Sequence, residues 1–446
     1  WGGNNEDETA LHWFAFSRQN RDLYVADWVE LYINTAMPAL RRVDPDVAFV
    51  DTSPSNGLVS SEPYVKKWGD VKDPRFGDVH YYDRDVDCEE AGHYPRARFV
   101  SEHGFQSYPS FQALEPVLAP GDWSRDSPIM LYRQRQGWDG NKQIHSMAER
   151  HLRLPPEHAA TRDGQREAFD SYIYLTQVQQ SRCYETALAQ WRRLRSDPEV
   201  GTMGILYWQI DDIWQAQSCS TMDWSGAWRV SHSAVQRSFA PVLASLLVEG
   251  GRLQAFVTSD LTEEISAELR VELRPWSGGG AHAWFSCSAS VRSGTRLCRA
   301  AALQDALRAS GCSPQTCFVH LEGSTRETPP RPLSAHAFLT ALKDAELPVA
   351  HLNVTAPRKL GPSRASLLVE SDAVAVYAWL ESEAVIGRFS PNALLLLPGR
   401  PVEVEFLGRS DFDLEAWARG LRARSVRDTY GQAPERERRS PVAYVV

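Results

Sequence analysis

The feature that most constrains the fold is an alternation of helical stripes and short apolar runs over residues 1–250. The first stripe, over residues 25–37, repeats apolar side chains at every third or fourth position, as the buried face of an amphipathic helix does. Short apolar runs, which are typical of buried strands, end near residues 50, 82, 102 and 210. Strands that alternate with helices favour a parallel sheet or a (β/α) barrel. We therefore predict the C-terminal half of a (β/α)8 TIM barrel, with one more strand before Trp1.

The periodicity changes near Gly250-Gly251. Over residues 265–273 and 402–406, apolar and polar residues alternate as they do in a half-buried strand. Gly, Pro and Ser turns separate further short runs between them. The sequence therefore predicts an α/β region followed by an all-β region, with one or two immunoglobulin-like β-sandwich domains over residues 251–430.

Several segments carry local predictions of their own. Apolar residues on one face predict a long helix over residues 170–195, and a last helix of the α/β region is expected over residues 233–247. Residues 278–310 are rich in Ala, Gly, Ser and Arg and predict an irregular loop. The charged residues 431–446 predict a disordered tail.

Composition narrows the function classes. The net charge of −9 gives no basic face, so a nucleic-acid partner is not expected. No apolar run reaches the roughly 18 residues of a membrane span, so no membrane partner is expected either. Fifteen tryptophans are many for a chain of this length, and such rings stabilise cores or stack on the apolar faces of sugars.

The cysteines and the single glycosylation sequon put few constraints on the fold or the function. Seven cysteines look too sparse for a disulfide framework, and their odd number leaves at least one thiol unpaired within the chain. Cys312 and Cys317 are close enough in sequence to close a small loop. No Cys/His spacing fits zinc, so neither a metal nor a cofactor is expected. Asn353, in Asn353-Val354-Thr355, is the candidate glycosylation site.

Two carboxylates lie at the predicted ends of parallel strands, Glu6 and Glu102. The carboxyl ends of the strands are where a barrel places its catalytic groups, and glycoside hydrolysis uses a pair of carboxyl groups there. Each residue also has a structural alternative. Glu6 fits the acidic first turn of a helix, where the macrodipole favours it, and Glu102 fits an ion pair with an arginine.

Asn4-Asn5-Glu6 together with Ser101-Glu102-His103-Gly104 resembles the retaining β-glycosidases of glycoside hydrolase family 2, and within it the animal lysosomal β-mannosidases. The resemblance is dense over residues 1–245 and thinner beyond. Its other segments are Trp1-Gly2-Gly3, Thr52-Ser53-Pro54, Asn56-Gly57, Phe76-Gly77-Asp78-Val79-His80, Ala97-Arg98-Phe99, Gly140-Asn141-Lys142-Gln143, Tyr174-Leu175-Thr176-Gln177-Val178, Gly201-Thr202-Met203-Gly204 through Trp214, Gly387-Arg388-Phe389-Ser390, and Val426-Arg427-Asp428-Thr429-Tyr430.

The resemblance implies a role for each matching residue. Glu6 would be the general acid/base and Glu102 the catalytic nucleophile. Asn5 would hydrogen-bond the sugar 2-hydroxyl, and Tyr82 would hydrogen-bond the nucleophile. Trp208 would form the platform under the sugar, with a tryptophan of the barrel core as its alternative.

His80 and Trp214 are weaker candidates for the pocket wall, because core packing fits them equally well. Asp211 and Asp212 are expected to cap a loop or to pair with an arginine. Together the resemblance implies a lysosomal retaining exo-β-mannosidase that removes terminal β-mannose from oligosaccharides, represented here by its C-terminal portion. The alternatives are another family 2 specificity, β-galactosidase or β-glucuronidase, and a non-catalytic carbohydrate-binding or structural fragment. The oligomeric state stays open.

Overall fold

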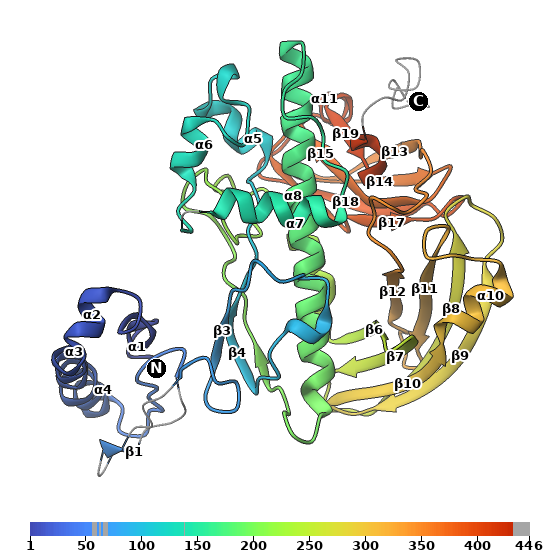
Figure 1. The fold of residues 1–446 in the computed structure, drawn as a ribbon. Helices are drawn as coiled ribbons and strands as arrows, with labels where there is room; N and C mark the ends of the chain where they lie inside the picture. The colour runs from blue at the N-terminus through green and yellow to red at the C-terminus, as the bar shows by residue number, and fades with distance from the viewer. Residues whose placement is uncertain (56–59, 62–63, 66–69, 138, 431–446) are drawn as a thin grey trace. The chain divides into compact units, whose positions relative to one another are not determined.

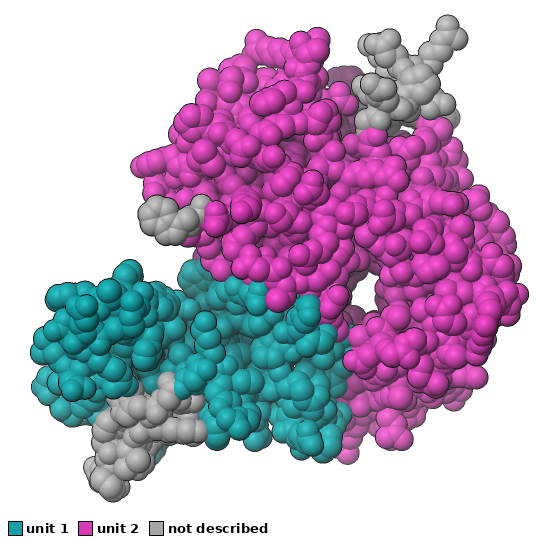
Figure 2. Space-filling model, in the orientation of Figure 1, with its two compact units in different colours: residues 1–83, 92–104, 190–208 teal, residues 84–91, 105–189, 209–446 magenta. Residues whose placement is uncertain are grey.

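The computed structural model describes residues 1–446 except 56–59, 62–63, 66–69, 138 and 431–446. The predicted disordered tail therefore lies outside the described residues. Two compact units make up the chain (Figure 2), and neither is a continuous segment. Unit 1 comprises Trp1–Asp83, Gly92–Gly104 and Gln190–Trp208, and unit 2 comprises Arg84–Ala91, Phe105–Ala189 and Gln209–Val446. The predicted domain boundary near residue 250 stays a prediction.

Unit 1 is built on parallel strands (Figure 1). β3 (Val79–Tyr81), β4 (Phe99–His103) and β5 (Gly204–Ile205) form a parallel sheet in that order, in which His80 pairs with Glu102 and Phe99 pairs with Gly204. Parallel bridges also join Gly2 to Val50 and Asn5 to Ser53. The parallel pairing confirms the predicted strand direction, although the strands are shorter than the apolar runs. The run that ends at residue 50 contributes bridges only.

The helical stripe after Glu6 becomes several consecutive helices in unit 1. They are α1 (Asp7–Ala10), α2 (Ala15–Gln19), α3 (Arg21–Trp28), the π-helix η1 (Val29–Ala36) and α4 (Met37–Val43). Trp28, Ile33 and Met37 are buried together, as their spacing predicts. α4 ends one residue before Asp44-Pro45, the predicted stop.

Unit 2 begins with short helices that lead to one long helix. They are α5 (Phe111–Leu114), η3 (Glu115–Val117), η4 (Pro120–Asp122), α6 (Pro128–Arg133) and α7 (Gly140–His151). α8 (Arg162–Arg193), the long green helix of Figure 1, confirms the prediction for residues 170–195. Tyr184, Leu188 and Trp191 are buried on it, and Ala189 is its last residue in unit 2. Within the described residues, no helix is both long and apolar enough to cross a membrane.

One predicted helix of this region is wrong in its second half. α9 (Val230–Ser238) is helical, but the chain then turns and β6 (Val242–Glu249) follows as a strand. Pro241 lacks the amide proton that a continuing helix needs. A short apolar run such as residues 242–248 fits a helix or a strand equally well from periodicity alone.

Two pairs of β-sheets follow, each with its own core. In the first pair, the sheets β10-β7-β6 and β12-β11-β8-β9 share a core that includes Val257, Leu269 and Val271. In the second pair, the sheets β13-β14-β18-β16 and β17-β15-β19 share a core that includes Phe406 and Trp417. The new strands are β7 (Arg252–Ser259), β8 (Ile265–Pro275), β9 (His282–Val291), β10 (Gly294–Ala302), β11 (Cys317–Thr325), β12 (Pro332–Phe338), β13 (Leu352–Gly361), β14 (Arg364–Ser371), β15 (Ala375–Ser382), β16 (Gly387–Ser390), β17 (Leu394–Leu396), β18 (Val402–Gly408) and β19 (Leu421–Arg424). The predicted change to an all-β region is confirmed, with α11 (Leu414–Arg419) as a short addition.

The irregular loop predicted over residues 278–310 is wrong. The segment forms β9, β10 and the helix α10 (Leu303–Ser310). Its Ala- and Ser-rich strands carry little hydrophobic pattern. Pairing with β8 and β7, and the Cys287–Cys298 disulfide between the two strands, define them instead.

The expectation that the cysteines are too sparse for a disulfide framework is also wrong. Cys88–Cys183 and Cys287–Cys298 are disulfides, and Cys312–Cys317 closes the small loop that its spacing predicts. Cys219 is a buried free thiol. The first pair is 95 residues apart in sequence, so only the fold brings its partners together.

Candidate active site

Glu6 is held at the start of α1 by its backbone rather than by helix capping. Its amide donates to the Ser53 carbonyl oxygen at 2.7 Å, and its φ of 64° is a left-handed conformation that few residues other than glycine adopt. The side chain makes no capping hydrogen bond. The Asn4 side chain accepts from the Asp7 amide instead, at 3.1 Å. Glu6 thus stands at the N-terminus of α1, as its structural alternative predicts, but its side chain contacts His80 and makes no capping hydrogen bond.

The Glu6 carboxylate contacts His80 of β3. His80 Nδ1 lies 2.9 Å from Glu6 Oε1 and 3.4 Å from Glu102 Oε2. The His80 side chain is only 4% exposed, while those of Glu6 and Glu102 are 26% and 15% exposed. His80 thus lies between the two carboxylates and contacts both, although the sequence made it only a weaker candidate for the pocket wall.

Glu102 projects from β4 and contacts Tyr82, just beyond β3. The Tyr82 hydroxyl donates to Glu102 Oε2 at 2.7 Å. The polar partners of Glu102 among the described residues are Tyr82 and His80, so the predicted alternative of an ion pair with an arginine is not what the structure contains. Burial raises the pKa of Glu102, although the Tyr82 hydrogen bond and the charge of His80 act to lower it; the nearby carboxylates of Glu6 and Asp78 raise it further.

A layer of hydroxyl groups lies behind His80. Ser53 Oγ is 3.0 Å from His80 Nε2 and donates to Asp78 Oδ2 at 2.6 Å. Ser101 Oγ also donates to Asp78 Oδ2, at 2.5 Å. The Ser55 amide and hydroxyl donate to Asp78 Oδ1 at 2.8 and 3.1 Å. Sequence reasoning gave no role to these residues. Strand alternation, which puts Asp78 and His80 on one face, was the signal that could have found Asp78.

Asn5 forms a parallel bridge with Ser53, and Trp208 lies three residues beyond the end of β5. Asn5 is exposed and its side chain makes no hydrogen bond to any described residue, which leaves the amide available to a ligand. Trp208 is 49% exposed, and its amide donates to the His103 carbonyl oxygen at 2.9 Å. A half-exposed ring is not a core tryptophan, so the alternative reading of Trp208 is wrong.

Trp214 and Asp212 both contact arginine side chains within unit 2. The guanidinium groups of Arg133 and Arg135 lie 5.4 and 5.8 Å from the Trp214 ring. Asp212 pairs with Arg229, as one of its predicted alternatives states. Trp214 belongs to unit 2 and the two carboxylates to unit 1, and its place in the pocket wall stays a prediction.

The candidate glycosylation site Asn353 lies on β13. Its amide donates to Glu370 Oε1 at 2.9 Å. The side chain is partly buried on the strand, and its modification stays a prediction.

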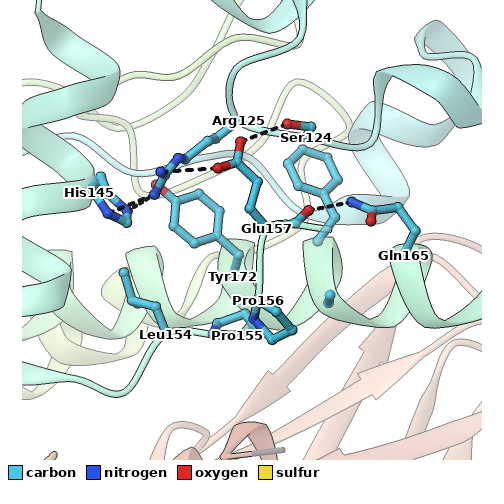
Figure 3. Close-up of a pocket in the computed structure, with 11 residues that line it drawn as sticks. Ser124, Arg125, His145, Leu154, Pro155, Pro156, Glu157, Gln165 and Tyr172 are labelled. Atoms are coloured by element: carbon cyan, nitrogen blue, oxygen red, sulfur yellow. Dashed lines mark hydrogen bonds and ion pairs between the residues drawn. The ribbon is translucent and has the colours of Figure 1, made fainter. Parts of the chain in front are cut away.

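Unit 2 contains a small cavity that is lined by charged side chains and is a second candidate site. Arg125, His145, Glu157 and Tyr172 line a cavity of about 30 Å³, shown in Figure 3. Arg125 pairs with Glu157 at 3.2 Å, and Ser124 donates to the same carboxylate at 3.1 Å. The charges of the cavity already satisfy one another.

The geometry of Glu6, His80 and Glu102 suits acid–base and nucleophilic chemistry. One ligand atom of each residue lies within 4.8 Å of those of the other two. A carboxyl separation near 5 Å is typical of retaining glycosidases, whereas inverting enzymes need about 6.5–9.5 Å to fit a water. The same atoms have metal-like spacing, but His80 Nδ1 is already hydrogen-bonded to Glu6 and lies at ion-pair distance from Glu102.

Residues 342–429 match the Ig-fold domain model of the mannosidase family. β-Mannosidase of Rattus norvegicus is 35% identical over 407 residues, which is 89% of this chain and 45% of that protein. The β-mannosidase of Bos taurus is 33% identical over 415 residues, again 89% and 45%. The chain therefore spans about half the length of the relatives it matches.

Solved structures share the fold. The β-D-mannosidase of Dictyoglomus thermophilum superposes with a TM-score of 0.74 at 18% identity, over 95% of this chain and 48% of that one. An exo-chitosanase of Amycolatopsis orientalis superposes with a TM-score of 0.60 at 11% identity, over 87% and 48%. The sequence similarity, the Ig-fold domain and the shared fold lead to one conclusion: the chain is homologous to the C-terminal portion of the β-mannosidases.

Proposed function

We propose that this protein is a retaining exo-β-mannosidase, with Glu6 as general acid/base and Glu102 as nucleophile. The observation that carries the proposal is the pair of carboxylates, of which one oxygen each lies within 4.8 Å of the other. Glu102 is on the parallel strand β4, and Glu6 directly follows the parallel bridge of Asn5 to Ser53. The names of the relatives supply the substrate class, terminal β-linked mannose. We also infer that the parallel strands of unit 1 belong to half of a (β/α)8 barrel, whose strand ends carry the site.

The proposed reaction has two halves. Glu102 attacks the anomeric carbon while Glu6 gives its proton to the departing glycosidic oxygen, so that one C–O bond forms as another breaks. Glu6 then takes a proton from water, and the water oxygen displaces Glu102. Two inversions at the anomeric carbon retain the β configuration.

The surrounding side chains have roles that follow from their positions. Tyr82 donates to Glu102 Oε2, which orients the attacking carboxylate and favours its ionised form. Asn5 would bind the sugar 2-hydroxyl, and the half-exposed face of Trp208 would carry the sugar ring. An acidic compartment such as the lysosome suits an enzyme whose acid must be protonated when substrate binds, and we propose that location.

Azide rescue tests the two carboxylate roles in matched variants of the complete protein. Glu102→Ala and Glu6→Ala should each lower the hydrolysis of a chromogenic β-mannoside by about a thousandfold or more. With azide, Glu102→Ala should give the α-mannosyl azide, because azide attacks opposite the leaving group. Glu6→Ala should give the β-mannosyl azide, because azide then attacks the glycosyl-enzyme.

Three outcomes would contradict the proposal. Unchanged turnover in Glu102→Ala would remove the nucleophile assignment. Faster hydrolysis of β-galactosides or β-glucuronides than of β-mannosides by the wild type would replace the specificity. Binding of mannosides without any cleavage would favour a carbohydrate-binding protein.

A further inference from the structure

A chain of hydrogen bonds runs from Asp78 through Ser53 and His80 to Glu6. Ser53 Oγ is 2.6 Å from Asp78 Oδ2 and 3.0 Å from His80 Nε2, and His80 Nδ1 is 2.9 Å from Glu6 Oε1. Nothing in the proposed function assigns a task to Asp78 or Ser53. Both are part of segments that the sequence singles out, Thr52-Ser53-Pro54 and Phe76-Gly77-Asp78-Val79-His80.

The proton of the Ser53 hydroxyl has to point to Asp78. Asp78 accepts from the Ser53 and Ser101 hydroxyls and from the Ser55 amide and hydroxyl, which is the pattern of a carboxylate. A carboxylate only accepts, and a hydroxyl has one proton to donate. If Ser53 donated elsewhere, two oxygens would face each other at 2.6 Å with no proton between them. The 3.3 Å contact between Ser53 and Ser101 is the weaker alternative.

The direction of the Ser53 hydroxyl proton determines which ring nitrogen of His80 is protonated. Ser53 Oγ can only accept from His80, so Nε2 must carry a hydrogen. The other ring nitrogen, Nδ1, faces oxygens of Glu6 and Glu102. The 2.9 Å contact between Nδ1 and Glu6 therefore requires one further proton, bound to either His80 or Glu6.

We propose that Asp78 and Ser53 are positioning residues that set the His80 tautomer and thereby keep a proton on the Glu6–His80 pair. The inference rests on the proposed function and deepens it. The shared proton is the one that passes to the glycosidic oxygen as its bond to the anomeric carbon breaks. In the second half of the reaction a proton of the attacking water returns to the pair, so the pair ends as it began.

The groups around His80 are consistent with this role. Glu6 and Glu102 face Nδ1, and Asp78 acts on Nε2 only through Ser53. Tyr82 donates to the Glu102 oxygen that lies nearest Nδ1, so that oxygen is already hydrogen-bonded. Ser53 also accepts the Glu6 amide with its carbonyl oxygen, so one residue positions both members of the pair.

An Asp78→Asn substitution should reverse the chain of hydrogen bonds. The Ser55 amide donates to Asp78 Oδ1, so the oxygen of the new amide has to stay on that side. Its nitrogen then faces Ser53 and donates to it, and the Ser53 proton turns to His80 Nε2. His80 would carry its hydrogen on Nδ1 instead, the wrong tautomer for holding a second proton against Glu6.

Nitrogen-15 NMR of histidine-labelled complete protein tests the tautomer without using activity. The chain has twelve histidines, and the signal lost in His80→Gln identifies the one of interest. We expect protonated Nε2 in the wild type and in Ser53→Thr, and unprotonated Nε2 in Asp78→Asn. Ser55→Ala is the matched control, because it removes a donor to Asp78 that does not contact His80; Nε2 should stay protonated. An unprotonated Nε2 in the folded wild type, or a protonated one in Asp78→Asn, would overturn the proposal.

The pH profile of kcat/KM for β-mannoside hydrolysis tests the consequence. In Ser53→Ala and Asp78→Asn the alkaline limb of the profile should move to lower pH by about one unit. At pH values above that limb, kcat/KM should fall by up to about a hundredfold. Ser53→Thr should restore the wild-type limb. A lower plateau with an unmoved limb would show a merely structural role and overturn the proposal. The expected tautomers without any mannosidase activity would instead refute the proposed function and leave the hydrogen-bond chain standing.

Discussion

At the scale of single residues, the role proposed for Glu102 puts two opposed demands on this side chain. Attack on a sugar requires an ionised carboxylate, yet burial and the neighbouring carboxylates of Glu6 and Asp78 raise its pKa. Tyr82 and His80 offset this only in part. An ionised Glu102 therefore costs folding stability, as active-site groups often do.

Glu102→Gln should raise the Tm, and the rise should grow with pH. A carboxyl group whose folded pKa lies above its unfolded pKa favours the folded state below the unfolded value, about 4.3, and loses that contribution as the pH rises through the folded value. Glutamine has no such loss. We expect a gain in Tm of about 2 °C or more at pH 7 and a smaller one at pH 4, measured by calorimetry. The exposed Glu249→Gln is the control, and an equal gain at both pH values would contradict the argument.

Trp208 offers the opposite case, a residue whose loss should affect catalysis more than folding. Trp208 as a whole is 49% exposed, so Trp208→Ala removes little core packing and should change the free energy of unfolding by less than about 1 kcal/mol. The lost sugar platform should lower kcat/KM by about tenfold to a hundredfold, with Trp208→Phe in between. Trp224→Ala, at a tryptophan of unit 2 that is 57% exposed, is the matched control. Equal kinetic effects in the two alanine variants would refute the platform role.

At the scale of elements, the segment after Trp208 is anchored by one buried arginine. The Arg229 side chain is fully buried and pairs with Asp212 and Asp223, which are 3% and 0% exposed. It also donates to the Ser107 hydroxyl at 3.2 Å and the Ser220 carbonyl oxygen at 3.1 Å. These contacts explain Asp212 of the Asp212-Ile213-Trp214 motif as a structural residue of unit 2.

Arg229→Met should destabilise the protein by about 3–5 kcal/mol, because it leaves two carboxylates buried without their cation. Urea unfolding followed by fluorescence measures the change. Arg270→Met, at a side chain that is 54% exposed and pairs with Glu272 and Glu322, should cost less than about 1 kcal/mol. Similar costs for the two substitutions would show that burial does not decide the strength of these pairs.

The elements also show what the sequence could predict. Glu6 and Glu102 were predicted from the rule that residues at the ends of parallel strands gather at one edge of a sheet, whereas the role of Tyr82 came from the resemblance to family 2 glycosidases. His80 was underrated because its place between the carboxylates depends on the register of β3 on β4, which pairs His80 with Glu102. Register is a long-range property, as is the Cys88–Cys183 disulfide. Strands β9 and β10 were missed because small residues leave little periodicity to read.

At the scale of the whole molecule, buried and half-buried histidines that stay neutral should set the response to acid. Burial lowers the pKa of His103 to about 3 and the pKa values of His232 and His336 to about 4. His103 packs against Trp191 with ring centroids 4.9 Å apart, and His336 packs against Phe338 at 4.7 Å. In the unfolded chain each histidine takes up a proton near pH 6.5, which the folded protein resists.

The free energy of unfolding should therefore fall as the pH falls from about 6.5 to about 4. A group with a lowered folded pKa stabilises the folded state above its unfolded value and loses that contribution as the pH falls towards its folded value. Each such histidine adds a slope that approaches about 1.4 kcal/mol per pH unit. His336→Gln should reduce the slope of unfolding free energy against pH, measured with urea between pH 4.5 and 7, whereas the exposed His282→Gln should leave it unchanged. If both variants keep the wild-type slope, other groups determine the acid response.

A reduced slope in His336→Gln alone would mean that a protein proposed to work in an acidic compartment is less stable there than at neutral pH. The loss would come from core packing that excludes the imidazolium form.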